Sequence, residues 1–206
     1  MAETFPSFAD VAPTRVGGAL ALDFVNTVEW RGDPQAKGER LVDYGEIAHW
    51  AAHAGIVERK SLRALLGEAA RRPADAARLH QEALALREAI ARLIARPARA
   101  DLARLNAHLR DRPAALVSTG GAYVWSGGPT DLLAAPLAAV ARDAAALLTS
   151  GRLARVRTCA DPRCGWMFVD PGRGPGRRWC SMASCGNRAK ARRHYRRGRS
   201  VTPARL

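Results

Sequence analysis

Four cysteines, the only ones in the chain, lie in two close pairs. Four residues separate Cys159 from Cys164 and Cys180 from Cys185, and 15 residues lie between the pairs. Two such pairs can place four thiolates around one tetrahedral Zn²⁺, a structural site because the protein fills every position. The alternative is disulfide bonding, for which four cysteines allow three connectivities.

The start of the chain favours the metal interpretation. Residues 1–6 have neither the basic start nor the apolar stretch of a secretory signal peptide. Disulfides persist mainly in oxidising compartments, so we expect a cytoplasmic protein whose paired cysteines hold zinc. No run of about 18 apolar residues occurs, and we therefore expect no transmembrane helix.

Positive charge is concentrated in the same part of the chain as the cysteines. The net charge of the whole chain is +14, and residues 151–206 hold 15 Arg or Lys against two acids, a net of +13. Such a cluster attracts polyanions and releases their counterions, so nucleic acid is the expected partner. No apolar face accompanies the charge, which disfavours a membrane surface. A solubilising basic tail is the simplest alternative.

The arginines after the last cysteine have a helical spacing. Arg188, Arg192 and Arg199 fall on one stripe of a helix that has few apolar residues to bury. Arginine can bind phosphate or guanine, and we expect phosphate contacts for most of these side chains. Arg177 and Arg178 either grip phosphate or only offset the thiolate charge. The candidate nucleic-acid-binding residues are Arg177, Arg178, Arg188, Lys190, Arg192, Arg193, Arg196, Arg197 and Arg199.

Residues 1–150 predict a mainly α-helical domain with a small β-hairpin. Residues 17–28 suit a helix or a strand, after an irregular arm over residues 1–17. Helices are expected over residues 40–54, 58–71, 74–95, 101–109 and about 131–149. Gly55 is expected to stop one of them, and Pro136 to kink the last. Leu116–Trp125, with Gly120-Gly121 at its centre, predicts the hairpin.

Residues 151–206 predict a small α+β zinc finger, with the domain boundary at Gly151. Strands over residues 153–158 and 165–170 would place the first cysteine pair at the turn of a hairpin. A helix is expected to start after the last cysteine, capped by Asn187, an order that is treble-clef-like. Three aromatic side chains are expected to fill its core, which is too small to be stable without metal: Trp166, Phe168 and Trp179.

A polar cluster interrupts the apolar residues near the N-terminus. Asp23 and Asn26 lie within an apolar run, so we expect both to be buried and hydrogen-bonded, near Arg40 or the hairpin. These three residues serve as structural caps and ion pairs, or they line a small-molecule pocket. No nucleophile elbow, phosphate loop or dinucleotide fingerprint occurs, and we do not expect an enzyme.

Two longer motifs resemble a known pair of domains. Cys-x4-Cys-Gly-Trp-x-Phe-x-Asp (159–170) and Arg-Arg-Trp-Cys-Ser-Met-x-x-Cys-Gly-Asn-Arg-x-Lys (177–190) resemble the CGNR zinc finger. Gly-Gly-x-Leu-Ala-Leu-Asp-Phe-Val-Asn-Thr (17–27) resembles the ABATE domain that usually precedes it. The resemblance implies a bacterial stress-induced transcriptional regulator that binds DNA through its finger.

The sequence therefore predicts a two-domain DNA-binding regulator, with a possible small-molecule effector for residues 1–150. One alternative is an RNA-binding or protein-interaction module in which zinc only stabilises the finger. A less favoured alternative is an enzyme that uses the polar cluster.

Overall fold

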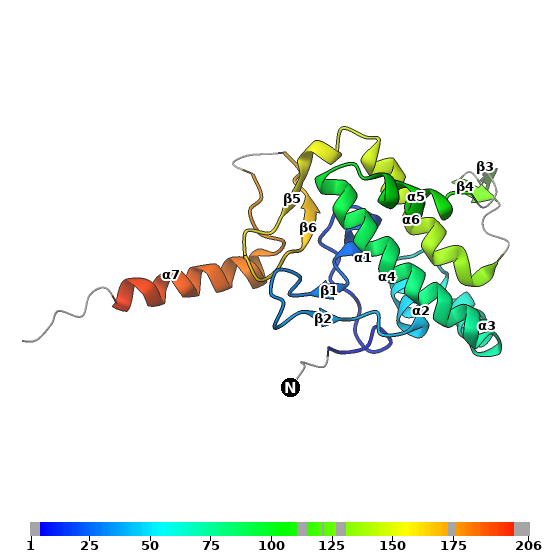
Figure 1. Cartoon of the computed structure of the whole chain (residues 1–206), viewed down its shortest axis with the longest axis horizontal. Coiled ribbons are helices and arrows are strands. Elements are labelled where there is room, and N and C mark those ends of the chain that lie inside the picture. The colour runs from blue at the N-terminus through cyan, green and yellow to red at the C-terminus, as the bar shows by residue number, and fades with distance from the viewer. Residues whose placement is uncertain (1–4, 111–114, 121, 127–130, 173–175, 200–206) are drawn as a thin grey trace, which may run out of the picture.

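A computed structural model describes residues 5–110, 115–120, 122–126, 131–172 and 176–199. The N-terminal region is mainly helical, as predicted (Figure 1). Its helices are α1 (Leu20–Val25), α2 (Tyr44–His53), α3 (Arg59–Arg71), α4 (Pro73–Ala95), α5 (Arg99–Ala107) and α6 (Ala135–Leu148), the last preceded by the 3₁₀ turn η1 (Leu132–Ala134).

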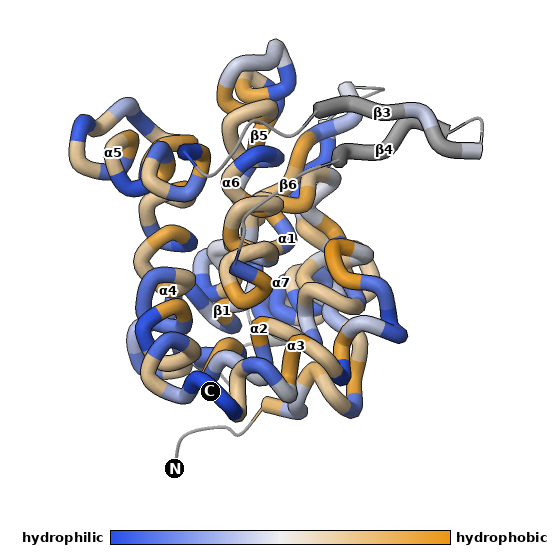
Figure 2. Tube along the Cα trace, turned by 90° about the vertical axis from the view of Figure 1, so that its right-hand side faces the viewer, coloured by the Kyte–Doolittle hydropathy of each residue, from blue (hydrophilic) through white to orange (hydrophobic). Residues whose placement is uncertain are grey.

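Helix α4 is the centre of this region and packs against α1, α2, α3, α5 and α6. Its residues Leu79, Leu86 and Ile90 recur at helical spacing and are buried, which confirms the core-facing stripe. Hydrophilic and hydrophobic residues alternate along its turns (Figure 2). Because its apolar face is long, α4 packs against five other helices, and they share a single hydrophobic core.

Several boundaries differ from the sequence prediction for local reasons. Helix α2 begins at Tyr44 rather than at residue 40, because the Asp43 side chain accepts a hydrogen bond from the Glu46 amide and caps it. Gly55 stops this helix with a φ of 77°. Pro136 was expected to kink a helix but lies in the first turn of α6, where its missing N–H costs nothing.

The described strands form three antiparallel pairs. They are β1 (Val28–Glu29) with β2 (Gly38–Glu39), β3 (Ala115–Thr119) with β4 (Ala122–Ser126), and β5 (Val156–Thr158) with β6 (Met167–Val169). The β3–β4 hairpin confirms the prediction around Gly120. Residues 17–28 resolve into helix α1 followed by β1. The irregular arm before them packs on the helices, because the Phe8 side chain is buried in the helical core.

The C-terminal region is a β-hairpin followed by a helix, as predicted. The 3₁₀ turn η2 (Leu153–Arg155) leads into β5, and a π-helical turn, η3 (Met182–Gly186), continues directly into α7 (Asn187–Arg199). Asn187 was expected to cap α7, but it lies within the continuous helix and its side-chain amide donates to the Ala183 carbonyl. Helix α7 extends away from the body of the molecule (Figure 1).

Candidate metal centre and nucleic-acid interface

The four cysteines form one buried cluster. Their ligand atoms all lie within 4.8 Å of one another, and no disulfide joins them. The Sγ atoms of Cys164 and Cys180 are 3.6 Å apart, and those of Cys180 and Cys185 are 3.4 Å apart. A tetrahedral ion with Zn–S bonds of about 2.3 Å needs sulfur atoms about 3.8 Å apart. The cluster therefore has the size of a four-thiolate zinc site.

The chemistry of the donors also fits a metal. Burial raises the pKa of Cys185 to about 12, and the neighbouring Cys180 sulfur, followed by burial, raises the pKa of Cys164. Without an ion these side chains would remain neutral thiols. A divalent cation deprotonates coordinating thiols and holds them as thiolates. The buried cluster is consistent with one bound zinc.

The hairpin and its turn hold the first cysteine pair. The Cys159 amide donates to the Trp166 carbonyl at 2.8 Å, and β5 pairs with β6 beyond it. Gly165 has a φ of 67°, and a Cβ there would lie 2.8 Å from the Gly32 nitrogen, so this position requires glycine. Phe168 is fully buried among the cysteines, with Trp166 and Trp179 packed beside them, as expected of a small core.

Asp161 is a buried acid that sequence reasoning missed. Asp161 lies between Cys159 and Cys164 in the sequence. Its side chain has no exposed surface, and its carboxylate pairs with Arg188 at 3.3 Å and with Arg192 at 3.0 Å. Burial opposes its ionisation, but hydrogen bonds led by Arg192 outweigh that cost and hold its pKa below the usual value. A signal existed, because only two acids, Asp161 and Asp170, occur among the 15 basic residues of 151–206.

Two of the candidate nucleic-acid residues on α7 therefore face the metal site. Arg188 donates from Nη2 to Cys185 Sγ at 2.8 Å as well as pairing with Asp161. Together with Arg192 it ties the first turns of α7 to the turn of the finger hairpin over residues 159–165, here called the knuckle, which carries the first cysteine pair. These contacts fix the direction in which α7 leaves the finger.

The other candidate residues divide into two groups. Arg177 lies 4.2 Å from the centre of the Phe168 ring and donates to the Trp179 and Cys180 carbonyls, while Arg178 lies over Trp179. The side chains of three exposed residues make no hydrogen bond or ion pair within the described part of the chain: Lys190, Arg193 and Arg196. The side chains of Arg197 and Arg199 lie outside the described residues.

Of the N-terminal polar residues, Asp23 and Asn26 are buried and Arg40 is half-buried, and the three contact different partners. Asp23 accepts a hydrogen bond from the Gly17 amide at 2.8 Å, and burial raises the pKa of its carboxyl. Asn26 donates to the Met167 carbonyl and accepts from the Met167 amide, both at 2.8 Å. Arg40 instead donates to the Pro6 carbonyl and stacks on Phe8.

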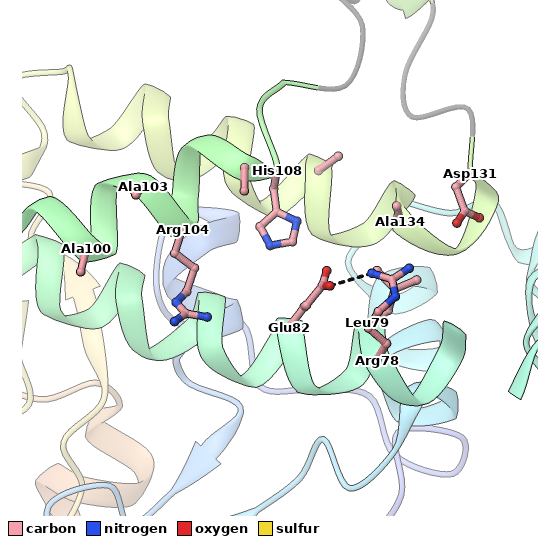
Figure 3. A pocket seen from close by; sticks show the side chains of 11 residues that line it. Arg78, Leu79, Glu82, Ala100, Ala103, Arg104, His108, Asp131 and Ala134 are labelled. Atoms are coloured by element: carbon pink, nitrogen blue, oxygen red, sulfur yellow. Dashed lines mark hydrogen bonds and ion pairs between the residues drawn. The ribbon is translucent and has the colours of Figure 1, made fainter. Parts of the chain in front are cut away.

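A separate cavity of about 520 Å³ lies between α4, α5 and the start of α6. Alanines form much of its wall, and Arg78, Glu82 and Arg104 bring charge to it (Figure 3). Glu82 points towards Arg78, with which it forms an ion pair at 2.6 Å. None of the three polar residues considered above lines this cavity.

The finger is joined to the N-terminal region by a continuous seam. Its contacts link residues 17–33 to residues 162–169 through backbone and side-chain hydrogen bonds. The Val169 amide donates to Gly17 O at 2.8 Å, Trp166 Nε1 donates to Val28 O at 2.8 Å, and the Gly32 amide donates to Arg163 O at 3.1 Å. Asn26 adds its paired bonds to β6. The finger therefore packs on the N-terminal region rather than hanging from a linker.

A helical region joined to a four-cysteine finger with a basic helix defines a two-part zinc-finger protein. The ABATE family model, described as "putative stress-induced transcription regulator", matches residues 18–151, and the CGNR zinc finger matches residues 155–198. The chain belongs to the ABATE family and carries a CGNR zinc finger. A search of curated proteins finds no match. The described residues contain no helix long and apolar enough to cross a membrane.

Proposed function

We propose that this protein is a zinc-dependent, DNA-binding transcription regulator whose finger presents α7 to duplex DNA. The observation that carries the proposal is the state of α7. Its basic residues are accompanied by no acid, and Asp161 and Cys185 anchor it at one end while the rest projects outwards. A solubilising tail would need no such anchoring.

The dimensions of α7 suit the major groove. An α-helix with its side chains is about 10–12 Å across, and the major groove of B-DNA is about 12 Å wide. Lys190, Arg193 and Arg196 are free to contact phosphates, whereas Arg188 and Arg192 are already engaged with the metal site. We assign the first group to phosphate binding and the second chiefly to positioning. One structural zinc holds the hairpin and α7 together, and no catalytic step is assigned.

The salt dependence of binding tests this assignment. Replacing Arg193 with alanine in the full chain should reduce the slope of log K against log[salt] by about 0.9, since one phosphate contact is lost. Arg59→Ala removes the same side chain from an exposed position on α3 and should leave the slope unchanged. Equal slopes for wild type and Arg193→Ala would contradict the phosphate contact.

RNA binding is the nearest alternative, because the same charge would attract it. A deep, narrow major groove prevents side chains from reading A-form RNA, so a projecting helix favours duplex DNA. Competition between duplex DNA and structured RNA of equal length separates the two. Stronger retention on RNA would overturn the DNA assignment, and binding to neither would favour a protein-interaction role.

We further propose that the N-terminal domain is regulatory and takes a small effector. The cavity of about 520 Å³ is within the usual range for ligand sites, about 300–1,000 Å³. It is a better candidate than the cluster of Asp23, Asn26 and Arg40, whose side chains are occupied by different partners. A bound effector should raise the melting temperature of wild type more than that of Arg104→Ala. An equal rise in melting temperature for wild type and Arg104→Ala would show that the effector does not bind in this cavity.

A further inference from the structure

The seam contains a tryptophan with an unusual backbone. Trp30 has a φ of 50°, the only positive φ among the described residues other than glycine. A bulky residue in this region is strained, and it persists only where its surroundings hold it. The turn is closed by the Asp33 amide, which donates to the Trp30 carbonyl at 2.8 Å. The strain therefore lies at the first residue of the turn over residues 30–33, which faces the finger.

Two arginines of the finger lie over the Trp30 ring. The guanidinium carbon of Arg188 is 4.6 Å from the ring centre, and that of Arg163 is 5.1 Å away. Both distances are within the range of cation–π attraction, about 6 Å. Arg163 also forms an ion pair with Asp33 at 2.7 Å. The turn and the knuckle are therefore joined by an ion pair as well as by the contacts to the Trp30 ring.

The turn approaches the knuckle too closely to be an incidental neighbour. A Cβ on Gly32 would lie 2.0 Å from the Pro162 carbonyl oxygen, which leaves no room for any side chain. Arg188 is at the centre of these contacts, since the same guanidinium group touches Trp30, Cys185 Sγ and Asp161. The N-terminal region thereby contacts the residue that fixes the base of α7.

We propose that Trp30 is a positioning residue for α7, so that the DNA-binding surface is built by both regions and the finger is not an autonomous module. The proposal rests on the proposed function only in taking α7 as the DNA-binding helix. Trp30 holds the Arg188 guanidinium in the plane where it reaches Cys185 and Asp161 together. Without the ring, Arg188 is free to turn, and the first turns of α7 lose one of their anchors.

Substitutions in zinc-loaded full-length protein test the proposal. Trp30→Leu keeps an apolar side chain but removes the ring, and Trp30→Phe restores a ring. Loss of the two cation–π contacts in Trp30→Leu should accelerate amide hydrogen exchange over residues 187–192 by about tenfold. Affinity for duplex DNA should fall by a similar factor with an unchanged salt slope, because the phosphate contacts are the same. Trp30→Phe should lie close to wild type in both measurements.

Three further variants complete the test: Trp30→Met, Gly32→Ala and Leu102→Ala. Trp30→Met replaces Trp30→Leu if the latter does not fold, since methionine adapts to irregular space. Gly32→Ala forces the turn away from Pro162 and should reproduce the faster amide exchange. Leu102→Ala changes an exposed side chain on α5 and should leave the exchange rates unchanged. Wild-type exchange and affinity in Trp30→Leu, or a Trp30→Phe as impaired as Trp30→Leu, would overturn the proposal. If wild type binds no DNA, the proposed function fails, and the exchange rates still decide whether Trp30 positions α7.

Discussion

Replacing Cys185 with serine should abolish stoichiometric zinc binding and unfold the hairpin and α7. Structural zinc binds zinc-finger peptides with about 10–16 kcal/mol, so the loss of one thiolate should be the largest effect of any single substitution. Metal analysis and circular dichroism provide the measurement. Helices α2 to α6 should remain, because their shared core around α4 contains no cysteine.

Ser184→Ala is the matched control for this substitution. Ser184 lies in the same π-helical turn, is exposed, and carries no metal ligand. It should retain one equivalent of zinc and wild-type helicity. A Cys185→Ser protein that still holds a full equivalent of zinc would contradict the four-cysteine site.

Replacing Asp161 with alanine should destabilise the finger by about 2–3 kcal/mol, because it leaves two arginines without their shared carboxylate. The full cost of breaking a buried pair, about 3–5 kcal/mol, is reduced here because the arginines are partly exposed and can be hydrated. The measurement is the urea unfolding curve of the zinc-loaded protein, monitored through the loss of helix α7. DNA affinity should also fall, since Arg188 and Arg192 no longer orient the helix.

Asp161→Asn provides a graded comparison, since the amide oxygen still accepts a hydrogen bond but the charge is gone. Its stability should lie between those of wild type and Asp161→Ala. Asp10→Asn changes the same group at an exposed position and should have almost no effect. If the urea midpoint of unfolding is the same for Asp161→Ala as for wild type, the carboxylate does not anchor α7.

The sequence predicted the features that depend on local spacing. The cysteine pairs, the α4 stripe, Gly55 and the β3–β4 hairpin all follow from periodicity, residue type or turn chemistry. Errors at Pro136 and Asn187 arose at element boundaries, where a shift of a few residues decides whether a side chain caps, starts or continues a helix. The metal site could be predicted because the type and spacing of its ligands leave few other interpretations of the four cysteines.

Contacts between distant segments could not be predicted in the same way. Arg188 falls on a basic stripe, and nothing within the stripe indicates that it turns back to Cys185. Asn26 and Met167 are 141 positions apart, so their paired hydrogen bonds exist only once the seam has formed. Trp30 likewise becomes informative only when its positive φ and the two arginines above it are seen together.

The most direct test of the central claim is the affinity of zinc-loaded full-length protein for duplex DNA at several salt concentrations. The three basic side chains without a partner in the described part of α7 predict a log–log slope at least as steep as about −2.7, from −0.9 for each phosphate contact. Removal of zinc by a chelator should abolish this binding, because α7 then loses its anchor. Absence of binding, or binding that neither salt nor zinc removal changes, would contradict the assignment of the finger as a DNA-binding element.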